Sequence, residues 1–165
     1  MTAEELKQRQ APLKARYKED PAAARQTMRV EGTLDPVHLR CELPARTGPL
    51  RPGLHPATGG TGHDACSADM LLEALAGCAS VTLLAVATSL GIPVESGWVV
   101  AEGDLDFRGT LGVSREVPVG FESIRLKFAL TPLPSAEQIG TLAKLCERYC
   151  VVAQSLKTPI TISIA

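Results

Sequence analysis

Apolar and polar residues alternate along several short segments of the chain, the period-two pattern of β-strands that bury one face. Strands of this kind are predicted over residues 37–43, 99–107, 124–130 and 160–164. A fifth strand around Met28 and Val30 is expected to pair with residues 37–43 as a hairpin, with its turn at Asp35-Pro36. These five strands are enough for one sheet.

The longest apolar stretch predicts a central helix. It starts at Ser67, a suitable N-cap, and runs to Leu90, after which Gly91 and Pro93 stop it. Between Met70 and Leu90 the only charged residue is Glu73, so the helix is apolar on nearly every side and is expected to be buried. Its length would also suit a membrane span, but its Ala, Ser, Thr and Gly content and the amphipathic strands that follow favour a core helix.

A second helix is predicted to begin at Ser135, which forms a capping box with Gln138. Its apolar stripe consists of Ile139, Leu142, Ala143, Cys146, Tyr149, Cys150 and Ala153. The elements follow the order ββ-α-ββ-α-β, an α+β domain around a wholly buried helix, which we assign to residues 27–165. Residues 1–26 are predicted as an extension of one or two short helices, interrupted by Pro12 and Pro21.

The segment from residue 44 to residue 66 is predicted as a loop rich in proline and glycine. It contains Gly59-Gly60-Thr61-Gly62, a cluster that could cradle a phosphate, but no basic residue follows at the start of the central helix. A hinge or a tight turn is therefore the better interpretation.

Composition limits the classes of partner. The net charge of −1 gives no basic face for nucleic acid, and an aromatic content of 4% leaves few platforms for stacking bases. The chain starts with charged residues and lacks the apolar core of a signal peptide. We therefore expect a cytoplasmic protein that binds neither nucleic acid nor membrane.

The cysteines carry the candidate chemistry. There are five, an odd number that argues against a framework of structural disulfides in a cytoplasmic chain. Cys78 lies mid-way along the central helix, and Cys146 and Cys150 share one face of the second helix. From the residues alone these are inert core cysteines, reactive thiols, or ligands of a zinc site that His63 and Cys66 would complete. The spacing lacks the compact Cys-x-x-Cys of most structural zinc sites.

Other candidate groups are less informative. Cys41 falls on the apolar side of its strand and is expected in the core. Asp104 and Asp106 share a strand face like a pair of catalytic carboxylates, but an exposed polar face is the better explanation. His38 and His55 have no nucleophile near them in the sequence.

Two motifs resemble those of the OsmC/Ohr family, the osmotically inducible protein C-like and organic hydroperoxide resistance proteins. Residues 66–83, Cys-Ser-Ala-Asp-Met-Leu-Leu-Glu-Ala-Leu-Ala-Gly-Cys-Ala-Ser-Val-Thr-Leu, resemble the helix that holds the family's first cysteine. Residues 147–152, Glu-Arg-Tyr-Cys-Val-Val, resemble its second cysteine site. The resemblance covers residues 27–165 and includes the order of the elements.

This resemblance implies an OsmC-like fold in an intertwined homodimer, and thiol-dependent reduction of organic hydroperoxides in oxidative stress defence without a cofactor. Cys78 would attack the peroxide and become a sulfenic acid, Cys150 would resolve it to a disulfide, and a dithiol or lipoyl-type donor would reduce that disulfide. An alternative is a thiol protein of the same fold that is not a peroxidase, either a small-molecule binder or a redox sensor.

The sequence departs from the family pattern at three places. The family's active-site Glu, ten residues before the first cysteine, is Ala68 here, and Asp69 next to it would face the other side of an ideal helix. The family's Cys-Pro is Cys150-Val151. The arginine that stabilises the thiolate has four candidates, Arg25, Arg29, Arg46 and Arg51.

Overall fold

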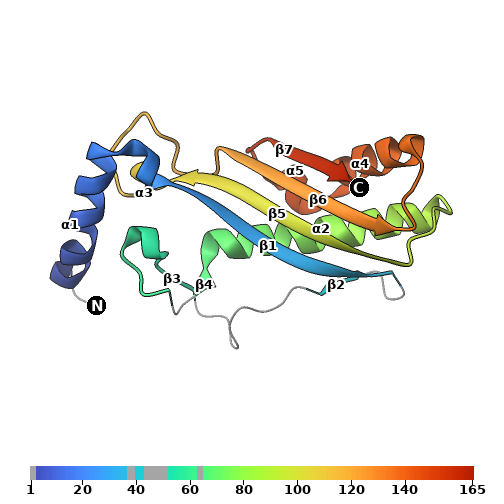
Figure 1. The fold of residues 1–165 in the computed structure, drawn as a ribbon, viewed down its shortest axis with the longest axis horizontal. Coiled ribbons are helices and arrows are strands. Elements are labelled where there is room, and N and C mark those ends of the chain that lie inside the picture. The colour runs from blue at the N-terminus through green and yellow to red at the C-terminus, as the bar shows by residue number, and fades with distance from the viewer. Residues whose placement is uncertain (1–2, 37–39, 43–51, 63–64) are drawn as a thin grey trace.

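The computed structural model describes residues 3–36, 40–42, 52–62 and 65–165 (Figure 1). One five-stranded sheet, in the order β2-β1-β5-β6-β7, forms the main layer. Its strands are β1 (Arg25–Asp35), β2 (Arg40–Glu42), β5 (Ser96–Asp106), β6 (Ser123–Thr131) and β7 (Ile160–Ile164). Neighbouring strands are antiparallel except β6 and β7, which run parallel. The α+β class predicted from the sequence is confirmed.

The helices lie on one face of this sheet. The long helix α2 (Ser67–Ser89) crosses β1 and β5, and α4 (Ala136–Tyr149) and α5 (Val151–Ser155) pack beside it (Figure 1). The alternation seen in the sequence places one set of strand side chains against α2, so these are buried while their neighbours face outward. The buried strand residues include Val99, Ala101, Leu105, Ile124, Leu126, Phe128 and Leu130.

The outer face of the sheet carries ion pairs. Arg125 holds Asp104 through two hydrogen bonds, one of them 3.1 Å long from Nη2 to Oδ1, and this pairing keeps the pKa of Asp104 well below its usual range. Asp106 differs from the prediction of an exposed polar face, because its side chain is fully buried and accepts three hydrogen bonds from the Arg108 guanidinium. Both carboxylates therefore have structural partners.

Helix α2 starts and stops close to the predicted residues. Its N-cap is Cys66, whose side chain makes no capping hydrogen bond, and Ser67 is the first helical residue rather than the cap. Gly91 ends the helix with φ +67°, in the left-handed region that glycine adopts without strain. By length and composition α2 could cross a membrane, but the sheet and α4 cover one side of it, as in a core helix.

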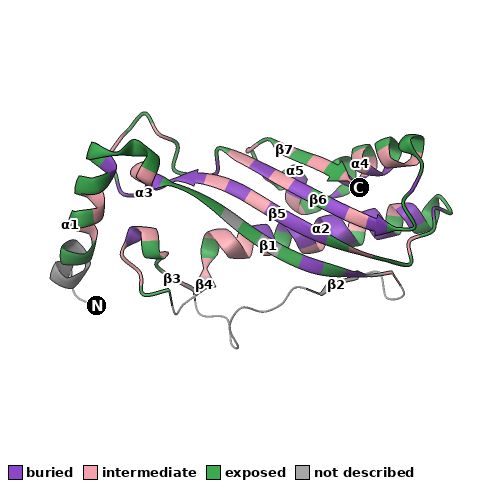
Figure 2. Ribbon diagram, in the orientation of Figure 1, coloured by how far each residue is buried: buried purple, intermediate pink, exposed green. Residues whose placement is uncertain are grey.

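The prediction of a wholly buried helix is wrong for the single chain. Leu72, Leu75, Ala79 and Leu83 face the core with no exposed surface, whereas the opposite side of α2 is open and Val81 is 41% exposed (Figure 2). Ala74, Ala85 and Thr88 are also exposed on that side. One sheet covers only one side of a helix, so a face of small and apolar residues remains uncovered.

Other differences are local. Helix α1 (Ala3–Glu19) continues through Pro12, which is exposed and is expected to leave the Gln8 carbonyl to water. A 3₁₀ turn, η1 (Pro21–Ala24), follows, and β1 begins two residues before the predicted domain boundary. The predicted strand over 99–107 ends at Asp106 because Phe107 opens a single helical turn, α3 (Phe107–Thr110).

The hairpin of β1 and β2 agrees with the prediction, with Leu34 opposite Cys41, but residues 37–39, including His38, lie outside the described part. The segment predicted as a loop contains two very short parallel strands, β3 (Pro52–Gly53) and β4 (Ala65–Cys66), and a 3₁₀ turn, η2 (Pro56–Thr58). The glycine cluster forms tight turns, as expected: Gly59 has φ +91° and a Cβ on Gly60 would meet the Leu54 carbonyl at 1.6 Å.

The N-terminal helix is attached to this loop. The Tyr17 hydroxyl donates to the Ala57 carbonyl at 2.8 Å, and the Gln10 amide donates to the Thr58 carbonyl at 3.2 Å. Tyr17 is 2% exposed, so α1 contributes to the core rather than lying loosely on the surface.

Candidate functional site

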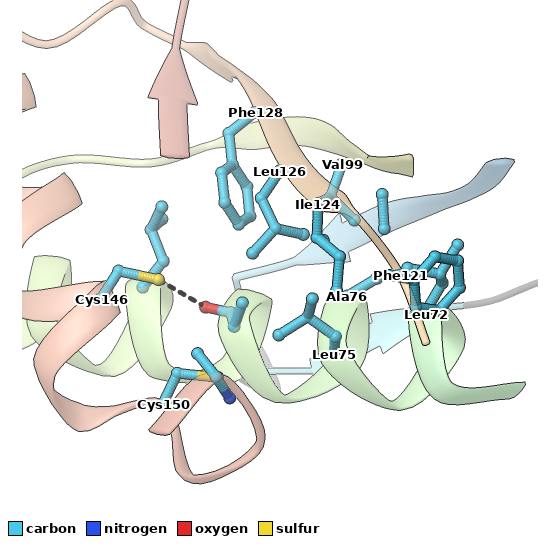
Figure 3. Packing of buried hydrophobic residues seen from close by; sticks show 14 of the residues in the cluster. Leu72, Leu75, Ala76, Val99, Phe121, Ile124, Leu126, Phe128, Cys146 and Cys150 are labelled. Carbon is cyan, nitrogen blue, oxygen red and sulfur yellow. Dashed lines mark hydrogen bonds between the residues drawn. The ribbon is translucent and has the colours of Figure 1, made fainter. Parts of the chain in front are cut away.

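Three of the four cysteines with described side chains gather between α2, α4 and α5. Cys78 is half-buried on α2, whereas Cys146 and Cys150 have no exposed surface. Figure 3 shows the side chains of Cys146, on α4, and Cys150, between α4 and α5, facing α2. The three side chains are close enough for a charge on Cys78 to raise the pKa of both other thiols.

Cys150 sits at a break between two helices. The prediction of one helix through Ala153 is wrong, because α4 ends at Tyr149 and α5 begins at Val151, with Cys150 in extended conformation between them. Its Sγ accepts a hydrogen bond from the Ala153 amide at 3.4 Å and so caps α5. Thus α5 starts directly after the cysteine although Val151 stands where the family has proline.

The side chains of Cys78 and Cys150 lie next to each other. Burial raises the pKa of Cys150 to about 11, the neighbouring Cys78 thiol acts in the same direction, and the capping bond from Ala153 opposes both. Cys150 therefore keeps its proton at neutral pH. Two neighbouring thiols, one of them partly accessible, can form a reversible disulfide after oxidation.

Cys146 is the member of the cluster that sequence reasoning did not assign to the site. Its Sγ donates to the Ala79 carbonyl of α2 at 3.3 Å (Figure 3). Burial raises the pKa of Cys146 to about 12, with smaller contributions from Cys150 and Cys78. The spacing of four residues to Cys150 was the available signal, but only the packing of α4 on α2 brings Cys146 beside Cys78.

Cys66 is separate from this cluster. It lies at the start of α2, about 18 Å along the helix axis from Cys78 at 1.5 Å per residue. It cannot join Cys146 and Cys150 around one zinc ion, whose ligands lie about 2.3 Å from the metal. Among the described residues, which exclude His63, no three His, Cys, Asp or Glu side chains are arranged to hold a metal.

The residues that the family pattern offers as partners of the Cys78 thiolate do not lie beside Cys78 in the part of the single chain that the structure describes. Arg29 pairs with Glu31 at 2.9 Å and lies opposite Glu102, on the sheet face away from α2. Arg25 lies beside Asp106, and Arg46 and Arg51 are outside the described residues. Ala68, in the first turn of α2, is about 15 Å along the axis from Cys78.

An apolar cavity of about 430 Å³ lies at this N-terminal end of α2. Ala68 and Leu71 of α2, Phe107 of α3, Phe121 and His55 line it, and the rings of His55 and Phe107 stack at 4.8 Å. His55 thus packs on an aromatic ring, and its Nδ1 accepts from the Ala57 amide. Among the residues that the structure describes, none with a carboxylate, lysine or arginine side chain lines this cavity.

A half-exposed thiol on the core helix, next to a buried thiol at the α4–α5 junction, is an arrangement that thiol-redox proteins use. The family model for OsmC-like proteins matches residues 60–165, and the chain belongs to this family. A search of curated protein sequences finds no match.

Two solved structures share the fold at low sequence identity. The first is an organic hydroperoxide resistance protein OsmC from Legionella pneumophila, described as a predicted redox protein and regulator of sulfide bond formation. It is 18% identical, with a TM-score of 0.58 over 76% of this chain and 88% of that one. The second is an OsmC-like protein of unknown function from Vibrio cholerae, 17% identical, with a TM-score of 0.59 over 76% of this chain and 82% of that one.

Proposed function

We propose that this protein reduces organic hydroperoxides through a two-thiol cycle in which Cys78 reacts with the peroxide and Cys150 resolves the product. The observation that carries the proposal is the proximity of these two thiols, one on α2 and one at the α4–α5 junction, which is close enough for Cys78 to raise the pKa of Cys150. Membership of the OsmC-like family and the fold shared with a hydroperoxide resistance protein support it.

The division of roles follows from exposure. Cys78 is the only partly exposed thiol of the cluster, so an organic peroxide can reach it without opening the core. Cys150 keeps its proton, and its S–H next to Cys78 would favour a thiolate there through a charge-assisted hydrogen bond. Cys78 therefore attacks, and Cys150 stays protonated until the second step.

In the first step the Cys78 thiolate attacks the terminal peroxide oxygen. The O–O bond breaks, an alcohol leaves after taking up a proton, and Cys78 becomes a sulfenic acid. In the second step the Cys150 sulfur attacks the Cys78 sulfur, a disulfide forms and water leaves. The amide of Ala153 at the Cys150 sulfur favours the negative charge that develops there. A dithiol or lipoyl-type donor then reduces the disulfide and completes the cycle.

The proposal includes a cytoplasmic homodimer. The open side of α2, with Val81 41% exposed, is a face that a second copy of the chain would cover. Position 68 lies about 15 Å along the helix axis from Cys78 within one chain, so a residue there would contact Cys78 only across such a dimer.

The test is turnover of several organic hydroperoxides in an assay coupled to a dithiol or lipoyl donor. Wild-type protein is expected to turn over, Cys78→Ser to lose all activity, and Cys66→Ser, a matched control outside the cluster, to keep it. Activity that survives in Cys78→Ser and disappears in Cys66→Ser would refute the assignment. Oxidation of Cys78 without turnover would instead favour a redox sensor.

A further inference from the structure

The two-thiol cycle leaves Cys146 unused, although it lies in the same cluster. Helices α4 and α2 pack against each other, and the Cys146 sulfur rests 3.3 Å from the carbonyl oxygen of Ala79, the residue after Cys78. Its S–H makes this one hydrogen bond and its surroundings are otherwise the apolar core (Figure 3). Cys146 is also near enough to Cys150 and Cys78 for a charge on either of them to raise its pKa.

We propose that Cys146 is a second resolving thiol, which forms a disulfide with Cys78 when Cys150 is unavailable. This inference rests on the proposed two-thiol cycle and extends it. When the Cys150 sulfur is blocked or absent, a thiol at position 146 protects the Cys78 sulfenic acid from further oxidation.

The step is balanced without a further reactant. Peroxide converts the Cys78 thiol to a sulfenic acid and is itself reduced to an alcohol. The Cys146 sulfur then attacks the Cys78 sulfur, the S–H proton leaves with the hydroxyl group as water, and a Cys78–Cys146 disulfide remains. To react, the Cys146 side chain gives up only its hydrogen bond to Ala79, since no ion pair holds it.

Cys150 reacts first in the wild-type protein. Its sulfur lies next to that of Cys78, and burial raises its pKa less than it raises the pKa of Cys146. The Cys146 thiol is therefore the harder of the two to ionise. We expect disulfide formation through Cys146 to be slower than through Cys150, and to become faster as the pH rises.

The experiment compares Cys150→Ser with the double variant Cys146→Ala/Cys150→Ser. Each is treated with increasing amounts of tert-butyl hydroperoxide, and intact and peptide mass spectrometry follow the state of Cys78. In the single variant we expect an intrachain Cys78–Cys146 disulfide and several-fold less sulfinic acid than in the double variant. Equal sulfinic acid in the two variants, without this disulfide, would overturn the inference.

A second arm separates this inference from the proposed function. The Cys150→Ser protein is equilibrated with oxidised glutathione, which forms a mixed disulfide with Cys78 that a second thiol can displace, without any peroxide chemistry. A Cys78–Cys146 disulfide here supports the pairing even if hydroperoxides prove not to be substrates, whereas its absence under both oxidants contradicts the pairing.

A Cys146→Ser/Cys150→Ser protein completes the set. It keeps a hydroxyl donor for the Ala79 carbonyl and a side chain of similar size, so it shows whether the alanine variant over-oxidises merely because α4 has shifted. We expect it to over-oxidise like the alanine double variant. Protection of Cys78 by serine would mean that position 146 only positions α4, and would overturn a redox role.

Discussion

Alkaline pH should destabilise this protein through its buried thiols, and Cys146 gives the clearest signal. Burial raises its pKa from an ordinary value near 9 to about 12, so the folded state holds the proton more tightly than the unfolded state. The resulting stabilisation is complete below about pH 9 and is lost as the pH rises toward about 12. Between about pH 8.5 and about pH 11, this one group lowers the free energy of unfolding by about 2.5 kcal/mol.

The assay is urea unfolding of wild-type protein and Cys146→Ala at both pH values. The alanine variant lacks the titrating group, so its loss of stability over this interval should be smaller than that of wild type by about 2.5 kcal/mol. Any constant cost of the substitution cancels in this comparison, as does titration of lysine and tyrosine. If the losses of unfolding free energy of the two proteins differ by less than about 0.5 kcal/mol over this pH interval, Cys146 is not buried as the structure has it.

Three further predictions concern packing and assembly. In sedimentation we expect the wild-type protein at twice the 17.5 kDa chain mass and Val81→Lys as a monomer, because the dimer would bury the new charge at the open face of α2. The control Trp98→Lys, on the face of the sheet away from α2, should remain a dimer. In urea titrations, Asp106→Asn should lower the free energy of unfolding by about 1.5–3 kcal/mol, because it weakens the buried pair with Arg108. Asp104 is partly exposed, so Asp104→Asn should lower it by less than about 1 kcal/mol. Tyr17→Phe removes the bond to Ala57 and should speed hydrogen exchange in α1 and η2 by roughly five- to tenfold if it costs about 1 kcal/mol, without changing exchange in β5.

The strands and the capping box could be predicted because their signals are local. Alternation of side chains fixes which face of β5 and β6 meets the core, and Ser135 and Gln138 form the predicted reciprocal bonds. The break at Cys150 could not be predicted. Cys146, Cys150 and Ala153 keep the spacing of one helical stripe, while the backbone between them changes conformation at Cys150.

The site was predicted only in part, for a similar reason. Family motifs pointed to Cys78 and Cys150, and the structure brings these residues together. The proximity of Cys146 depends on how α4 packs on α2, which no spacing along the chain encodes. Likewise, the apolar composition of α2 indicates that most of it will be covered, but not whether the sheet or a second chain covers a given face.

The proposed two-thiol cycle depends most on the pairing of Cys78 with Cys150, and peptide mapping after oxidation tests this pairing directly. Reduced wild-type protein receives one equivalent of an organic hydroperoxide, free thiols are blocked by alkylation, and the digest is analysed without reductant. We predict one disulfide-linked species that joins the peptide of Cys78 to that of Cys150, with Cys66 alkylated. Full alkylation of Cys78, or a disulfide that includes Cys66 in its place, would contradict the account.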